Sequence, residues 1–299
     1  MHTIPLGPSV LPIRLVLSAV ALVVLVLVSV HLSPIWTNLP MYAIGFPHYF
    51  LALYYSKRGI ANVWNHPRGI GLLLAFLPLS FLPWFLPTPV IVKLLVLYFA
   101  IHHAMSEVYF DAKDHSKQLR TAHWWAVVSS YFAITGHHLH SALPVQAIGW
   151  VGTLVFTTVF FLIAKRENGL SLPSMLRTCP WIFLGPLVAL AGEWVYLDWR
   201  FLINWHFVFW LFLPYLRKGM FTQQKLRSYW LQNGFMTLAL LLLIMWMNNP
   251  KFLIGQELGH GLKLGLRNFF FTWSFLHISL SFLVSGGNPD WIKRILSKG

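Results

Sequence analysis

The chain has 299 residues, of which 57% are hydrophobic and only 10% are charged, whereas soluble domains usually carry about 25% charged residues. Together with long apolar runs, this composition excludes an ordinary soluble domain and predicts an all-α fold, a polytopic transmembrane helical bundle. The formal net charge of +14 does not predict a nucleic-acid partner, because the Lys and Arg residues fall in short clusters between the apolar runs.

About ten apolar segments are long enough to be membrane spans, and we predict that residues 1–299 form a single integral membrane domain around them. In chain order the predicted spans are Leu11–Val30, Ile35–Tyr55, Gly69–Leu86, Thr88–Asp111, His123–Leu143, Ala147–Ala164, Pro180–Leu197, Phe201–Leu216, Trp230–Met247 and Asn268–Val284. We expect the first of these to be an uncleaved helix rather than a signal peptide, because only Arg14 supplies a basic N-terminal region and no small-residue cleavage site follows.

The positive charges between the spans indicate the orientation of the chain. Lys and Arg cluster in every second connection and at the C-terminus, which predicts cytoplasmic termini and a multi-pass protein of the cell inner membrane. One connection disagrees, since it carries Lys251, Lys263 and Arg267. Its segment Phe252–Leu266 has apolar residues at helical spacing and predicts a separate interfacial helix. The oligomeric state is not indicated.

A ladder of ionisable side chains occupies the fourth predicted span. His103, Glu107, Asp111 and His115 recur at intervals of four, which places them along one face of a helix. A lipid-facing helix cannot cheaply carry such a ladder, so we expect His103 and Glu107 to face the bundle interior. We expect His115, like His123 at the start of the next span, to be solvated at the cytoplasmic surface.

Four histidines, His48, His103, His206 and His277, lie within the predicted spans and are the candidate metal ligands. Cys179 is the only cysteine, so a multi-thiolate zinc site is excluded. If a metal site exists, we expect at least three of the four imidazoles to converge. Glu107, one turn from His103, is the candidate catalytic residue, because it could orient that imidazole or accept a proton.

Two other interpretations of the histidines remain open. The imidazoles could simply be packed and hydrogen-bonded between helices. Alternatively, His137, His138 and His140 near the outer end of the fifth span could form a site with Glu193.

The chain contains three short motifs: Phe46-Pro47-His48, His103 followed by Glu107, and Trp205-His206. Together they resemble the Brp/Blh family of integral-membrane carotenoid 15,15′-dioxygenases. The resemblance implies an all-helical iron enzyme with histidine ligands that cleaves a carotenoid.

The chain also departs from this family at three positions. Leu51-Ala52-Leu53 stands where the family has an acidic residue after the first motif, and Glu107 is one residue further from His103 than the family's acid. Trp210 replaces the second histidine after Trp-His. The motifs therefore indicate a histidine-rich membrane metal enzyme more strongly than they indicate a carotenoid substrate.

The function predicted from these patterns is a metal-dependent oxygenase, with iron (Fe²⁺) as cofactor, acting on a lipophilic small molecule in the lipid bilayer. The alternatives are a b-type cytochrome with paired histidines on haem, a transporter with an ionisable pathway, and a structural membrane protein without catalysis.

The orientation can be tested with reporter fusions. Fusions placed after Leu86 and after Leu143 should both report an external location, because the positive charges lie in the connections on the other side. A cytoplasmic signal from either fusion would contradict the ten-span topology.

Overall fold

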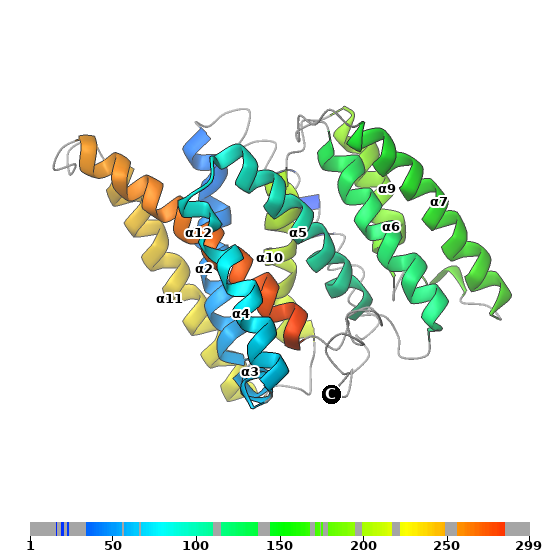
Figure 1. Cartoon of the computed structure of the whole chain (residues 1–299), viewed down its shortest axis with the longest axis horizontal. Helices are drawn as coiled ribbons and strands as arrows, with labels where there is room; N and C mark the ends of the chain where they lie inside the picture. The colour runs from blue at the N-terminus through cyan, green and yellow to red at the C-terminus, as the bar shows by residue number, and fades with distance from the viewer. Residues whose placement is uncertain are drawn as a thin grey trace. The chain divides into compact units, whose positions relative to one another are not determined.

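The computed structural model describes most of the predicted helical regions of the chain (Figure 1). The described residues are 16, 19, 20, 23, 34–55, 57–65, 67–109, 115–136, 144–167, 171–173, 175, 179–194, 199–216, 222–248 and 256–284. Within these ranges the regular structure is entirely helical, with no strand, so the predicted all-α fold class is confirmed.

The elements in chain order are the following helices: α2 (Pro34–Tyr55), α3 (Lys57–Trp64), α4 (Pro67–Phe81), the short 3-10 helix η1 (Leu82–Trp84), α5 (Thr88–Tyr109), α6 (Lys117–Thr135), α7 (Val145–Arg166), α9 (Trp181–Gly192), α10 (Trp199–Leu216), α11 (Gln223–Asn248) and α12 (Gln256–Val284). Each predicted span from Ile35–Tyr55 onward overlaps one of these helices. The predicted span Leu11–Val30 lies mostly outside the described residues.

In the residues that the structure describes, the helix predicted at Phe252–Leu266 is present from Gln256 onward, but it is not separate from the last predicted span. α12 runs without interruption from Gln256 to Val284, so the glycine-containing segment and the last predicted span form one helix of 29 residues. Glycine weakens a helix by only about 1 kcal/mol per residue relative to alanine. The segment contains no proline, which is the residue that breaks helices strongly.

Three of the described helices are long and apolar enough to cross a membrane. They are Thr88–Val108 in α5, Val145–Arg166 in α7 and Gln223–Trp246 in α11. At 1.5 Å rise per residue, helices of this length match a hydrocarbon core about 30 Å thick. This finding is compatible with a membrane protein.

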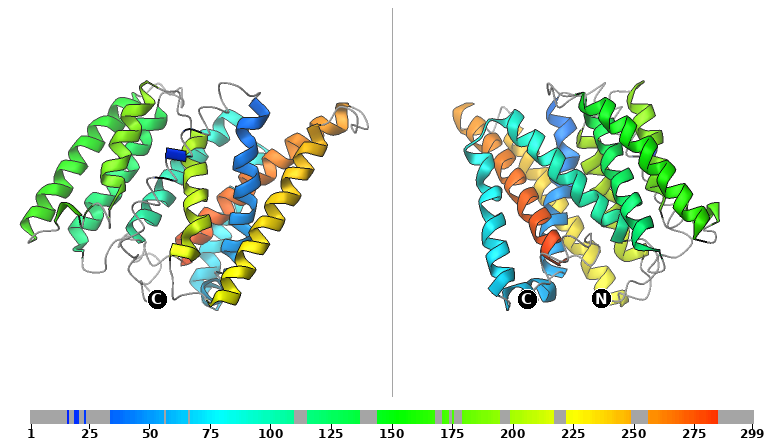
Figure 2. Two further views of the ribbon diagram at one scale, coloured as in Figure 1. Left: turned by 180° about the vertical axis from the view of Figure 1, so that it is seen from behind. Right: turned by 45° about the vertical axis from the view of Figure 1, so that its right-hand side comes forward.

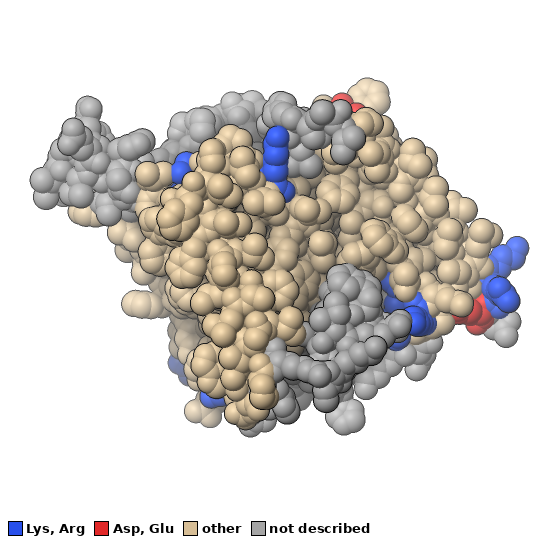
Figure 3. Space-filling view, viewed as in Figure 1, with Lys and Arg blue, Asp and Glu red and all other residues tan. Residues whose placement is uncertain are grey.

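Two of these helices expose a continuous apolar face. On α11, Leu231, Phe235, Leu238 and Leu242 are all more than half exposed and recur at intervals of three or four residues. α7 presents a similar face through Ile148, Val151, Val155, Val159 and Leu162. On the face in Figure 3, most of the described surface carries neither Lys or Arg nor Asp or Glu. Such apolar faces suit contact with lipid chains.

The chain divides into two compact units, each built from segments distant in sequence. Unit 1 comprises residues 1–26, 96–202 and 285–299, and unit 2 comprises residues 27–95 and 203–284. Residues 1–299 were predicted to form one integral membrane domain.

In unit 1, α6 packs against α7 and α9, and these helices lie side by side in both views (Figures 1 and 2). Ser116 immediately precedes α6, and its hydroxyl caps the helix by accepting a hydrogen bond from the backbone N–H of Leu119 at 3.0 Å. Gly149 of α7 lies directly against the α6 backbone, since a Cβ there would be 2.2 Å from the backbone nitrogen of Ala133. Small residues at such contacts allow helices in lipid to approach closely.

In unit 2, α12 packs against α2 and α4, and α11 packs against α2. Gly45 of α2 allows a similarly close approach, because a Cβ there would lie 2.7 Å from ring atoms of both Phe207 in α10 and Phe270 in α12. Gly45 therefore brings three helices together within one turn of His48.

The close contact at Gly149 gives a stability prediction. Gly149→Ala should destabilise unit 1 by about 1–3 kcal/mol, because the added methyl group meets the backbone of α6, which cannot rotate away. Unfolding in mixed detergent, followed by circular dichroism, measures the change.

Gly234→Ala in α11 is the matched control. No atom lies within 4 Å of a Cβ at this position, so the substitution should be neutral or stabilising by up to ~1 kcal/mol. Equal losses of stability in both variants would contradict the proposed packing.

Candidate metal centre

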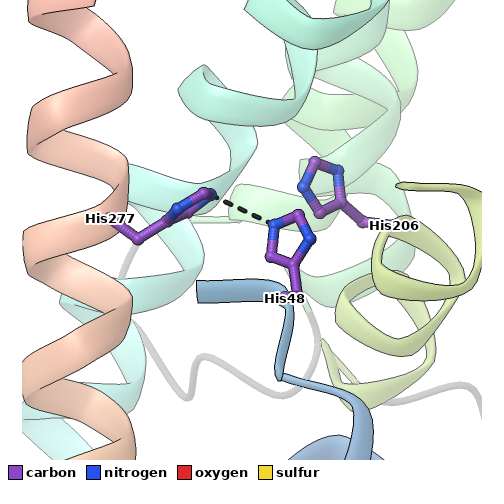
Figure 4. A group of neighbouring side chains, drawn as sticks. All are labelled: His48, His206 and His277. Carbon is purple, nitrogen blue, oxygen red and sulfur yellow. Dashed lines mark hydrogen bonds between the residues drawn. The ribbon is translucent and has the colours of Figure 1, made fainter. Parts of the chain in front are cut away.

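Three imidazoles from three helices converge in unit 2. His48 of α2, His206 of α10 and His277 of α12 each offer one ring nitrogen, and these three nitrogens all lie within 4.8 Å of one another. His48 lies between the other two, as Figure 4 shows. His206 and His277 are buried and His48 is half-buried, so the group is enclosed by the helices that carry it.

The closest approach within this group joins two ring nitrogens directly. His48 Nε2 and His277 Nε2 are 3.2 Å apart, within hydrogen-bond distance (Figure 4). In neutral imidazoles, one of these nitrogens donates its proton and the other accepts it. The rings of His48 and His206 have centroids 5.5 Å apart, at nearly a right angle.

The separation of these nitrogens matches the edge of a metal coordination sphere. Two nitrogens, each ~2.0–2.1 Å from one ion at a tetrahedral angle, are roughly 3.4 Å apart. The His48–His277 distance of 3.2 Å is close to this value. All three nitrogens lie within 4.8 Å of one another, which is somewhat more than a shared ion requires. Small rotations of the His206 side chain can bring its nitrogen to the required separation.

Aromatic side chains surround the three histidines. The Phe207 ring lies 5.1 Å and the Trp210 ring 6.3 Å from the His48 ring, measured between centroids. Tyr49 lies on another side, 5.2 Å from His277 and tilted by 39°. Much of the immediate surroundings of the imidazoles is therefore aromatic.

A hydrogen bond next to the histidines ties α2 to α12. The Tyr49 hydroxyl and the Ser274 hydroxyl lie 2.6 Å apart, and Ser274 also donates to the carbonyl oxygen of Phe270. Tyr49 follows His48 directly, and Ser274 precedes His277 by one helical turn. The sequence analysis missed both residues, although a polar side chain adjacent to, or one turn from, an intramembrane histidine is a signal that could have found them.

His103 belongs to unit 1 and has other neighbours. Its Nδ1 contacts the Tyr131 hydroxyl of α6, and its Nε2 lies 3.1 Å from Oε1 of Glu107. Both His103 and Glu107 are almost fully buried, which confirms that they face the protein interior. Because both ring nitrogens of His103 have partners in this unit, we do not include it among the ligands of the candidate centre. Asp111 of the same ladder lies outside the described residues.

The prediction that His115 and His123 are solvated is wrong. His115 is 5% exposed and His123 is completely buried. His115 Nδ1 lies 3.9 Å from Cys179 Sγ, and His123 packs against the Phe160 ring. Positive charges near these histidines suggested a surface location, but the packing of α6 against α7 and α9 buries them.

Only part of the competing outer site is described. Glu193 is exposed, and its carboxylate accepts hydrogen bonds from Gln146 at 2.7 Å and from Trp150 at 3.1 Å. His137, His138 and His140 lie outside the described residues.

Comparisons of the chain with protein-family models, with curated proteins and with solved structures find no match.

The Tyr49–Ser274 hydrogen bond can be measured with a double-mutant cycle. Tyr49→Phe and Ser274→Ala each remove one hydroxyl and little volume. Their coupling free energy should be about 0.6 kcal/mol, and up to ~1.7 kcal/mol, as for other hydrogen bonds between helices in a membrane. Denaturation in mixed micelles of the two single variants and the double variant gives this value. A coupling of zero would mean that the two hydroxyls do not link α2 to α12.

Proposed function

We propose that His48, His206 and His277 bind one divalent transition metal, with iron (Fe²⁺) as the natural occupant. The observation that supports this proposal is the convergence of three ligand nitrogens within 4.8 Å from three separate helices. Neutral imidazole is a suitable ligand for iron, copper and zinc. A three-histidine set also leaves coordination positions open for a small molecule, as catalytic metal sites require.

The activity that we propose for this centre is oxygenation of a lipophilic small molecule. Bound Fe²⁺ supplies one-electron and O₂ chemistry. The residues of the chain hold the ion through three neutral ligands and surround it with the Tyr49, Phe207 and Trp210 rings. This wall favours an apolar substrate over a charged one. A carotenoid is one such substrate, and that choice depends only on the motif resemblance.

The surroundings that we propose are a lipid bilayer crossed about ten times, with both termini in the cytoplasm, in the cell inner membrane. The exposed apolar faces of α7 and α11 and the alternation of Lys and Arg support this arrangement. An oxygenase embedded in this way meets a lipophilic substrate inside the membrane.

The haem alternative agrees less well with the His48–His277 pair. Two axial imidazoles on one iron are separated by two metal–nitrogen bonds of ~2 Å each, on opposite faces of the porphyrin. A direct contact of 3.2 Å between the two ring nitrogens leaves no space for the porphyrin plane between them. The structural alternative agrees better, because the same contact is a hydrogen bond that joins α2 to α12.

Metal binding separates the metal centre from the structural alternative. The full chain, purified in detergent and treated with chelator, should bind Fe²⁺ under anaerobic conditions, and Co²⁺ as a spectroscopic probe, at one ion per chain. Gln substitution of His48, His206 or His277 should weaken binding by at least ~100-fold, because even partners of metal ligands typically contribute 10–100-fold. Elemental analysis and the visible bands of Co²⁺ measure both effects.

His123→Gln is the matched control, because His123 is a fully buried histidine of unit 1. It should bind the ion as the unchanged chain does. If the unchanged chain binds no ion, and His48→Gln instead lowers the stability of the fold, the three histidines have the structural role. If the ion binds but no O₂ is consumed with polyene substrates in nanodiscs, the metal centre stands and the oxygenase proposal fails.

A further inference from the structure

A chain of hydrogen bonds in unit 1 links three ionisable side chains. Tyr131 of α6 bonds to Nδ1 of His103, and Nε2 of His103 bonds to Glu107 at 3.1 Å. All three residues are at most 2% exposed. None of these three residues is a proposed ligand of the candidate metal centre.

The charge on Glu107 sets the direction of these hydrogen bonds. With Glu107 ionised, its carboxylate only accepts, so Nε2 of His103 carries the proton that is donated to it. Nδ1 of the neutral ring is then an acceptor, and the Tyr131 hydroxyl donates to it. The phenolic proton therefore points at a base that is itself supported by a negative charge.

Apolar rings and a further hydrogen bond enclose this chain. The Trp181 ring of α9 lies 4.9 Å from the His103 ring, and its Nε1 donates to Ser130 at 2.7 Å. Phe99 of α5 packs against both His103 and Tyr131. These groups keep water away from the phenol of Tyr131. Exclusion of water protects an oxidised form of this phenol from side reactions.

Burial in this setting favours the coupled loss of an electron and a proton. Removing an electron alone from Tyr131 would leave an uncompensated positive charge in a low-dielectric interior, which is strongly unfavourable. If the proton moves to His103 at the same time, the positive charge forms next to the Glu107 carboxylate and is balanced by it. Tyr49 is one of the other nine tyrosines of the chain, and its hydroxyl is bonded to the Ser274 hydroxyl. A serine hydroxyl is too weakly basic to take a phenolic proton.

We propose that Tyr131 is a redox-active tyrosine, with His103 as its proton acceptor and Glu107 as the charge that stabilises the imidazolium. In the oxidising step, the phenolic O–H bond breaks and an N–H bond forms at Nδ1 of His103. One electron passes to a one-electron oxidant of the transition-metal-complex class, whose metal is lowered by one oxidation state. The reverse step restores the phenol and the neutral imidazole.

The test generates the radical in the purified full chain in detergent, after chelator treatment so that its outcome does not depend on the proposed metal centre. Photogenerated tris(bipyridine)ruthenium(III) is the oxidant, and rapid freezing followed by electron paramagnetic resonance detects the product. A tyrosyl radical whose spectrum shows coupling to an imidazole nitrogen is expected, and its formation should be slower in D₂O. Tyr131→Phe should abolish this nitrogen-coupled signal, and Glu107→Gln should reduce its yield.

Tyr229→Phe in α11 is the matched control, since it removes a buried phenol that is bonded to a backbone carbonyl oxygen, and it should leave the nitrogen-coupled signal unchanged. A signal that survives Tyr131→Phe overturns the proposal, as does a formation rate that is the same in H₂O and D₂O. If Tyr131→Phe fails to fold, the unchanged chain labelled with ¹⁵N-histidine decides the question. The coupling must then change to the ¹⁵N pattern, and a radical without histidine coupling overturns the proposal.

Discussion

Buried imidazoles in apolar helices are the constraint on which much of this structure depends. A polar group removed from water must have a partner, and lipid supplies none. The chain meets this requirement in two ways. In unit 2, His48 and His277 bond to one another across two helices. In unit 1, His103 bonds to a phenol on one side and a carboxylate on the other. The first solution joins helices from distant parts of the sequence, whereas the second joins α5 to the next helix, α6.

These two solutions imply different chemistry, because the partners differ. An imidazole beside other imidazoles is surrounded by neutral nitrogen ligands, which suits a metal ion. An imidazole between a phenol and a carboxylate has a hydrogen-bond partner in the protein for each ring nitrogen. This arrangement suits the transfer of a proton. Glycines near both sites allow close contacts between side chains and backbone. Gly45 brings α2 close to Phe207 and Phe270, and Gly185 leaves room for the bond between Trp181 and Ser130.

Much of the fold could be predicted from the sequence, because the length of an apolar run limits the length of a helix. The grouping of His48, His206 and His277 could be anticipated only in part. Their depth along each span follows from the sequence, but the angle at which each side chain points does not, since an apolar helix shows little difference between its faces. The position of His103 along its predicted span was equally suitable for a metal ligand, yet α5 places its side chain beside Tyr131. His115 and His123 were misplaced because nearby positive charges indicated a surface that helix packing covers.

The long sequence separation of the closest histidine pair has a consequence for biosynthesis. His48 and His277 are 229 residues apart, so the ribosome has made most of the chain before they can meet. Until α12 has been made, His48 lacks the partner that His277 supplies in the folded chain, so this link between α2 and α12 forms only late in synthesis.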